Sequence, residues 1–166
     1  MADVDENSRA AGILEGLLAS AKDCFHEDLL SVILFGSGAE GKLRHSSDLN
    51  LLIILKRFDQ ERVNSFREPL RAAHLAGRVK TMFLLESELP LAAEAFAVKF
   101  DDIERRRKVL FGSDLIAGLA IPREAKKARL RQVLANYMLR LRERYALVSL
   151  REEQLIPLVA DSAGPL

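Results

Sequence analysis

Two short apolar runs, separated by a glycine-rich turn and a polar loop, constrain the fold of this chain more than any other feature. They lie at residues 31–35 and 50–55, on either side of the segment GSGAEGKLRHSSDL. Aliphatic and β-branched runs of this length, bounded by turn residues, are typical of buried strands. The connection from Gly36 to Asp48 is too short for a crossover helix with its loops. The two strands are therefore predicted to be antiparallel, or part of a mixed sheet.

The rest of the chain predicts an α/β (α+β) fold, in which a small mixed sheet is flanked by helices. The predicted helices span residues 13–25, 59–76 and 87–96, and further strands span 79–85 and 107–112. Pro69 is expected to kink or split the second helix, and Gly77 is expected to be its left-handed C′ residue. Ser87 is expected to cap the third helix, with Pro90 in its first turn.

A long C-terminal helix is predicted over residues 122–150, with Pro122 as its first residue. Its apolar residues form one stripe: Leu130, Val133, Leu134, Tyr137, Leu141, Tyr145 and Val148. We expect two parts, an α/β domain at 1–121 and a helix with a tail at 122–166. The second part is expected to begin a further helical region absent from this sequence. The stripe is expected to be covered partly by the α/β core and partly by self-association or that missing region.

Composition excludes several classes of protein. Twenty-five Lys and Arg residues against 24 Asp and Glu give a net charge of +1, so no global field attracts nucleic acid or membrane. Aromatic residues make up 6% with no tryptophan, which leaves little for bases to stack on and makes nucleic acid an unexpected partner. The single cysteine, Cys24, excludes an internal disulfide. No signal peptide or membrane span is evident, so a cytoplasmic location is expected.

The turn after the first strand is a candidate phosphate site. Gly36 and Ser37 are followed by Gly38 and Gly41, and such a turn can direct backbone N–H groups and the Ser37 hydroxyl at one anion. The spacing matches neither a P-loop nor a dinucleotide-binding fingerprint. A glycine-rich connection without a ligand explains the turn equally well.

The start of the second strand adds a candidate metal ligand. Asp48 and Asn50 are two residues apart, so on a strand their side chains share one face. Two carboxylates at these positions, facing the turn, would hold two Mg²⁺ ions over a triphosphate for nucleotidyl transfer.

With this arrangement the sequence resembles the nucleotidyltransferase superfamily typified by DNA polymerase beta. The matching residues are Gly36, Ser37, Gly41, Ser47, Asp48 and Leu49. The resemblance implies a nucleotidyltransferase-like fold, nucleotide or phosphate binding by Gly36, Ser37, Gly41 and Ser47, and weak binding of Mg²⁺ by Asp48. Residues beyond Gly77 also resemble a bacterial group of nucleotidyltransferase-like proteins.

Two departures from the family pattern bear on catalysis. Asn50 stands where a second carboxylate is expected, so this catalytic position is degenerate. The third carboxylate of the family lies on a later strand, where this chain has Lys80, Thr81 and Met82, and the first acid, Glu86, comes only at the strand's end. A unit charge pair at 4 Å is worth about 4 kcal/mol at an effective dielectric constant of about 20, so these losses weaken metal binding.

Three functions stay open from the sequence. The first is a nucleotidyltransferase-like protein that binds a nucleotide or phosphate but transfers poorly or not at all. The second is an active Mg²⁺-dependent enzyme that moves a nucleoside monophosphate onto a small molecule or a protein hydroxyl. The third is a non-catalytic interaction domain that uses the long helix.

Other motifs have structural explanations. The triplet Gly112-Ser113-Asp114 echoes the first turn, but Gly112 is expected to end a strand and Ser113 or Asp114 to cap a short helix. His45 is expected to be solvated in the polar loop. His26 and His74 are too far apart in sequence to indicate a zinc site. Basic runs at residues 105–108 and 123–131 are expected to be solvated faces.

Overall fold

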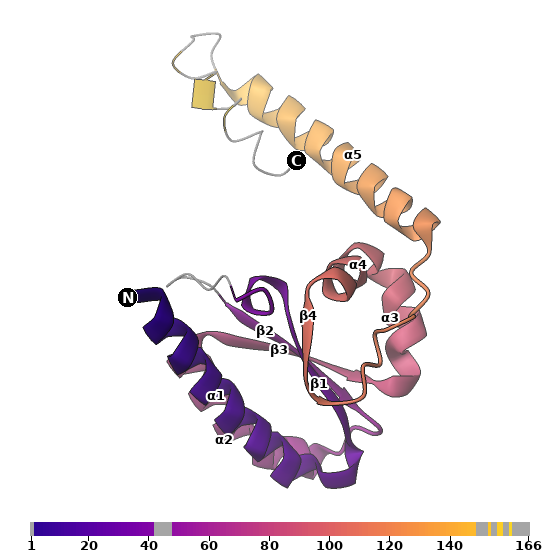
Figure 1. Cartoon of the computed structure of the whole chain (residues 1–166). Helices are drawn as coiled ribbons and strands as arrows, with labels where there is room; N and C mark the ends of the chain where they lie inside the picture. The colour runs from indigo at the N-terminus through magenta and orange to yellow at the C-terminus, as the bar shows by residue number, and fades with distance from the viewer. Residues whose placement is uncertain (1, 42–47, 149–152, 154–155, 158–159, 161–166) are drawn as a thin grey trace. The chain divides into compact units, whose positions relative to one another are not determined.

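The computed structural model describes residues 2–41, 48–148, 153, 156–157 and 160 (Figure 1). The chain divides into two compact units, Met1–Pro122 and Arg123–Leu166. The predicted boundary at 121/122, with its assignment of domains, stays a prediction. No described helix is long and apolar enough to cross a membrane.

The first unit is built on a four-stranded mixed sheet, in the order β3-β2-β1-β4. Its strands are β1 (Leu29–Phe35), β2 (Leu49–Leu55), β3 (Val79–Leu85) and β4 (Arg107–Gly112). β1 is antiparallel to both β2 and β4, whereas β2 is parallel to β3. The mixed sheet predicted from the short Gly36-to-Asp48 connection is confirmed. The helix between β2 and β3 supplies the crossover that their parallel pairing requires.

Two pairs of helices cover the two faces of the sheet (Figure 1). α1 (Ala2–Phe25) and α2 (Gln60–Gly77) pack on one face, where Phe25 and Phe66 meet edge to face with ring centroids 5.2 Å apart. α3 (Leu89–Ala95) and α4 (Ala97–Arg105) pack on the other face, against Ile33, Leu52 and Ile54. Side chains alternate between faces along a strand, so β1 and β2 are buried on both sides.

The bounds of α2 agree with the predicted helix to within one residue, but the left-handed residue that follows it differs from prediction. The Asp59 side chain accepts hydrogen bonds from the backbone N–H groups of Glu61 and Arg62, and the helix then runs through Pro69 as a single element. Gly77 is not the left-handed residue that the sequence predicts. It is the last helical residue, and Arg78 takes the left-handed conformation with φ 52°. A Cβ at position 77 would lie 2.7 Å from Ile13 Cδ1, so glycine there permits α1 to pack closely.

The segment after β3 also differs from prediction. Ser87 caps no helix and lies in a short 3₁₀ turn, Glu86–Glu88, before α3 begins. The Glu88 carboxylate closes this turn by accepting the Leu85 N–H at 2.9 Å. The separate helix α4 has no counterpart in the predicted elements, although Ala97, Phe100 and Ile103 bury one of its faces.

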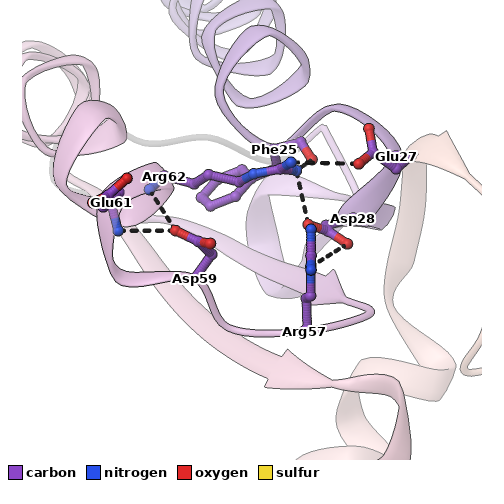
Figure 2. A network of polar contacts seen from close by, with 7 residues as sticks. All are labelled: Phe25, Glu27, Asp28, Arg57, Asp59, Glu61 and Arg62. Carbon is purple, nitrogen blue, oxygen red and sulfur yellow. Dashed lines mark hydrogen bonds and ion pairs between the residues drawn. The ribbon is translucent and has the colours of Figure 1, made fainter.

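A network of charged groups ties the start of β1 to the end of β2 and to α2 (Figure 2). Its centre is Asp28, which is 3% exposed. Arg57 Nε lies 3.1 and 2.9 Å from the two oxygens of Asp28, and Arg62 Nη1 lies 2.7 Å from Oδ2. Arg62 also donates to the carbonyl oxygen of Phe25, the last residue of α1. The network therefore joins four elements at the end of the sheet opposite the Gly36 turn.

The second unit contains the long helix α5 (Arg123–Leu147), in agreement with the predicted helix. None of its residues is buried in the structure, and Leu130 and Tyr145 are 58% and 54% exposed. Val133, Tyr137 and Leu141 of the apolar stripe are half-buried. Coverage of the stripe by the α/β core or by another protein surface stays a prediction.

Candidate functional site

The Gly36–Ser37 turn is a single 3₁₀ turn, Gly36–Gly38, directly after β1. Gly36 has φ 74°, a left-handed conformation that glycine adopts without steric cost. Its N–H donates to the Arg106 carbonyl at 2.9 Å, and the Ala39 N–H donates to the Gly36 carbonyl at 3.1 Å. Part of the expected set of backbone donors is therefore used within the protein. Within the described residues, the half-buried Ser37 hydroxyl has no hydrogen-bond partner.

Strand pairing brings three side chains into one row beside this turn. Asn50 on β2 is opposite Phe35 on β1 and opposite Lys80 on β3. Paired residues on adjacent strands point to the same face, which here is the face covered by α3 and α4. Asn50 Nδ2 lies 3.8 Å from the position that a Cβ at residue 36 would occupy. Asn50 is thus adjacent to the turn, and Lys80 is adjacent to Asn50.

Asp48, immediately before β2, is held by two cations. Arg78 Nε lies 2.9 Å from Asp48 Oδ1, and Lys80 Nζ lies 2.6 Å from Oδ2. The Asp48 side chain is 23% exposed, whereas those of Arg78 and Lys80 are 58% and 57% exposed. Asn50 contributes a long contact, 3.5 Å from its Nδ2 to the Asp48 carbonyl oxygen. Both carboxylate oxygens of the predicted metal ligand therefore already have positively charged partners.

These contacts keep Asp48 ionised. The hydrogen bond from Lys80, followed by that from Arg78, holds the pKa of Asp48 below its ordinary value. A lowered pKa means that the stabilisation from these contacts is fully present above the ordinary Asp pKa of about 3.9. It is lost as the pH falls through the lower pKa of the folded state. At neutral pH the cluster of Asp48, Arg78 and Lys80 carries one net positive charge.

The residues at this site do not fit two divalent metal ions. The side chain that faces Asn50 from the third strand is Lys80, a cation, where the family pattern has a carboxylate. Across the described residues, no group of three His, Cys, Asp or Glu side chains is placed to hold a metal ion. Mg²⁺ prefers several oxygen ligands in octahedral geometry, often from carboxylates and phosphates. Asp48 alone, already paired with two cations, is expected to bind Mg²⁺ weakly.

Further cations border the turn from α4 and its end. Lys99 Nζ lies 5.7 Å from the ring centroid of Phe35, within the range of a cation–π contact. Arg106, whose carbonyl accepts the Gly36 N–H, has its guanidinium near Asp102 and 3.8 Å from Glu40. The turn is therefore bordered by positive side chains from β3 on one side and from α4 on the other.

The other predicted site residues are only partly placed. The Gly41 N–H donates to the Gly38 carbonyl at 3.4 Å, so Gly41 continues the turn. Ser47 and His45 lie outside the described residues. Neither Arg78 nor the pairing of Lys80 with Asp48 was predicted from the sequence. Aligning the predicted strand starts, residues 50 and 79, would not have paired residue 80 with residue 50, so this pairing is seen only in the register of the structure.

The second glycine-serine-aspartate triplet follows the predicted end of a strand, but a turn takes the place of the predicted short helix. Gly112 ends β4, and Asp114 Oδ1 accepts the N–H groups of Ile116 and Ala117, closing a turn rather than a helix. Asp114 also pairs with Arg107 at 2.9 Å, and this hydrogen-bonded partner lowers the pKa of Asp114. The first residue of the basic run, Arg105, also forms an ion pair within the protein, with Asp101 at 2.6 Å.

Comparison with known proteins places this arrangement in a known fold. No family model matches the chain. The crystal structure of the spectinomycin adenyltransferase AAD(9) from Enterococcus faecialis, described with ATP and spectinomycin, is similar over 79% of this chain and 67% of its own. The TM-score is 0.61 and the sequence identity 12%. The protein has the nucleotidyltransferase fold. The resemblance drawn from the Gly36–Ser37 turn and Asp48 is confirmed at the level of this fold.

A curated relative supports the same fold by sequence. A Methanocaldococcus jannaschii protein described as "Putative protein adenylyltransferase" is 42% identical over 52 residues. The match covers 31% of this chain and 35% of the relative, so the chain spans about a third of that relative's length.

Proposed function

We propose that this nucleotidyltransferase-like protein binds a nucleoside triphosphate or a related phosphate ligand at the Gly36–Ser37 turn, and transfers nucleotidyl groups poorly or not at all. One observation carries the proposal: Lys80 faces Asn50 from β3 and pairs with Asp48 at 2.6 Å. Two metal ions require negative charge at this position. The Lys80 side chain brings a positive charge instead, which favours phosphate.

The groups around the turn are suited to an anion. The Ser37 hydroxyl and the Asn50 amide are neutral donors, and Lys80 and Arg78 are charged donors with exposed side chains. Charged donors form the stronger hydrogen bonds to phosphate oxygens. The fold neighbour AAD(9) is described with ATP, which supports a nucleoside triphosphate as the ligand here.

Transfer requires more than binding. In two-metal catalysis, paired ions stabilise both the attacking and the leaving oxygen. Asp48 is the one carboxylate that the described residues offer at the positions where the family has its metal ligands, and both its oxygens contact cations. In an active Mg²⁺-dependent enzyme the first metal ion would have to bind Asp48 against the positive charges of Arg78 and Lys80. This observation favours the non-catalytic binder over the active enzyme.

Replacing Ser37 with alanine tests the ligand site. We expect Ser37→Ala to weaken ATP binding about tenfold, because it removes a hydroxyl donor to a charged phosphate group. The loss is expected both with Mg²⁺ and with a chelator present. Ser113→Ala is a matched control, since Ser113 occupies the equivalent position in the triplet that only closes a turn. Isothermal titration calorimetry of the two variants and the wild-type protein measures the difference.

Two results would count against this assignment. If the wild-type protein shows no heat of ATP binding and no thermal stabilisation by ATP, the turn is a connection without a ligand. The interaction-domain alternative is then favoured. If Ser37→Ala and Ser113→Ala bind ATP equally well, the nucleotide binds elsewhere on the protein.

A further inference from the structure

The position occupied by divalent metal in an active site of this kind is next to Asp48, and here two side-chain cations fill it. We propose that Lys80 and Arg78 act in place of the metal, so that the site binds metal-free triphosphate more tightly than its magnesium complex. The inference rests on the proposed function and specifies the form of its ligand. It predicts that Mg²⁺ opposes binding instead of assisting it.

Each oxygen of the Asp48 carboxylate already has a positively charged partner. Its Oδ1 contacts Arg78 Nε at 2.9 Å, and its Oδ2 contacts Lys80 Nζ at 2.6 Å. A magnesium ion bound to either oxygen would share that oxygen with a charge-assisted hydrogen bond or displace it. In both cases it would lie close to the positive charge of Arg78 or Lys80, which repels it. Asp48 is therefore already neutralised without metal.

The two cations keep donors that Asp48 does not use. An ammonium group has three N–H donors, and a guanidinium has five. Lys80 uses one donor on Asp48 Oδ2, and Arg78 uses its Nε–H on Oδ1. Both side chains are more than half exposed, so their other donors are open to a ligand. Asp48 serves to hold the two cations in place beside Asn50.

Charge beyond this cluster also favours the more negative ligand. Lys99 lies against Phe35, which precedes the turn, and the nearby carboxylates lie on the Arg106 side. A metal-free triphosphate is more negative than its magnesium complex, so a net positive surrounding binds it better. Among the described residues, the charged groups around Asp48 and the turn leave one net positive charge, with four cations (Arg78, Lys80, Lys99 and Arg106) against three carboxylates (Asp48, Asp102 and Glu40).

The test compares ATP binding in excess chelator with ATP binding in saturating Mg²⁺, with inorganic triphosphate as a second probe. We expect the wild-type dissociation constant to be about fivefold higher with Mg²⁺. Lys80→Ala is expected to weaken metal-free binding about tenfold and to remove the difference between the two conditions. Lys80→Arg should keep the wild-type preference. Lys56→Ala is the matched control, because Lys56 is an exposed lysine just beyond the other end of β2.

The outcomes separate this inference from the proposed function. A magnesium penalty in the wild-type protein and in Lys56→Ala, absent in Lys80→Ala, supports the inference. Tighter binding with Mg²⁺ in the wild-type protein overturns the inference and leaves nucleotide binding intact. No binding of either probe in either condition overturns both. Inorganic triphosphate that binds as tightly as ATP would show that the phosphates, and not the base, are recognised, which supports the inference. Thermal melting of each variant confirms that it is folded.

Discussion

Replacing Asp28 with alanine is expected to lower the free energy of unfolding by about 3–5 kcal/mol. Asp28 is 3% exposed and has partners on both carboxylate oxygens. Its loss would leave Arg62, whose side chain is 23% exposed, without its 2.7 Å partner. Removing one member of a buried ion pair is costly because the remaining charge stays poorly solvated.

The neighbouring residue supplies the control. Glu27 also pairs with Arg62, at 3.3 Å, but its side chain is 72% exposed (Figure 2). Solvent screens such a pair, so Glu27→Ala is expected to leave stability nearly unchanged. Urea denaturation followed by circular dichroism compares the two variants. Equal stability of Asp28→Ala and Glu27→Ala would show that the network in Figure 2 does not hold β1, β2 and α2 together.

Replacing Gly112 with alanine is expected to cost about 3 kcal/mol or more in the free energy of unfolding. Gly112 has φ 75°, which costs a residue with a Cβ about 1–2 kcal/mol. A Cβ at this position would also overlap the Leu30 carbonyl oxygen and lie 3.1 Å from Ser31 Cα. These atoms belong to β1, which pairs with β4 at this point, so they cannot move without disrupting the sheet.

Gly118 separates the conformational cost of a positive φ from the cost of steric overlap. It has the same φ of 75°, but a Cβ there would have no atom within 4 Å. Gly118→Ala is therefore expected to cost only the conformational term, about 1–2 kcal/mol. Chemical denaturation gives the free energy of unfolding of both variants, and the difference between them is the cost of the steric overlap at Gly112. Equal destabilisation of the two would contradict the close packing of Gly112 against β1.

Local patterns predicted most of the sheet, because strand signals depend on residues close in sequence. The predicted bounds of β3 agree with the structure, and those of β1 and β2 begin two residues and one residue too late. Helix α4 was missed because its nine residues bury only Ala97, Phe100 and Ile103, too short a pattern to separate from the following strand.

Features set by contacts distant in sequence were less predictable. Gly77 resembled a helix terminator, but the space left by its missing side chain is used by Ile13 of α1, and Arg78 takes the left-handed position instead. In this position Arg78 bonds to Asp48, so the packing of the fold bears directly on the candidate site. The sequence showed that an acid is missing from β3. Only the register between β2 and β3 showed that Lys80 faces Asn50.

The proposed role of this protein is nucleotide binding on a nucleotidyltransferase fold, without metal-dependent transfer. The most direct measurement is the release of labelled pyrophosphate from ATP with Mg²⁺, in the presence of mixed small-molecule and protein acceptors. It compares the wild-type protein with Asp48→Asn. We predict no Mg²⁺-dependent release by the wild-type protein above that of Asp48→Asn, although the wild-type protein binds ATP. Robust wild-type turnover that is lost in Asp48→Asn would contradict this role and identify an active nucleotidyltransferase.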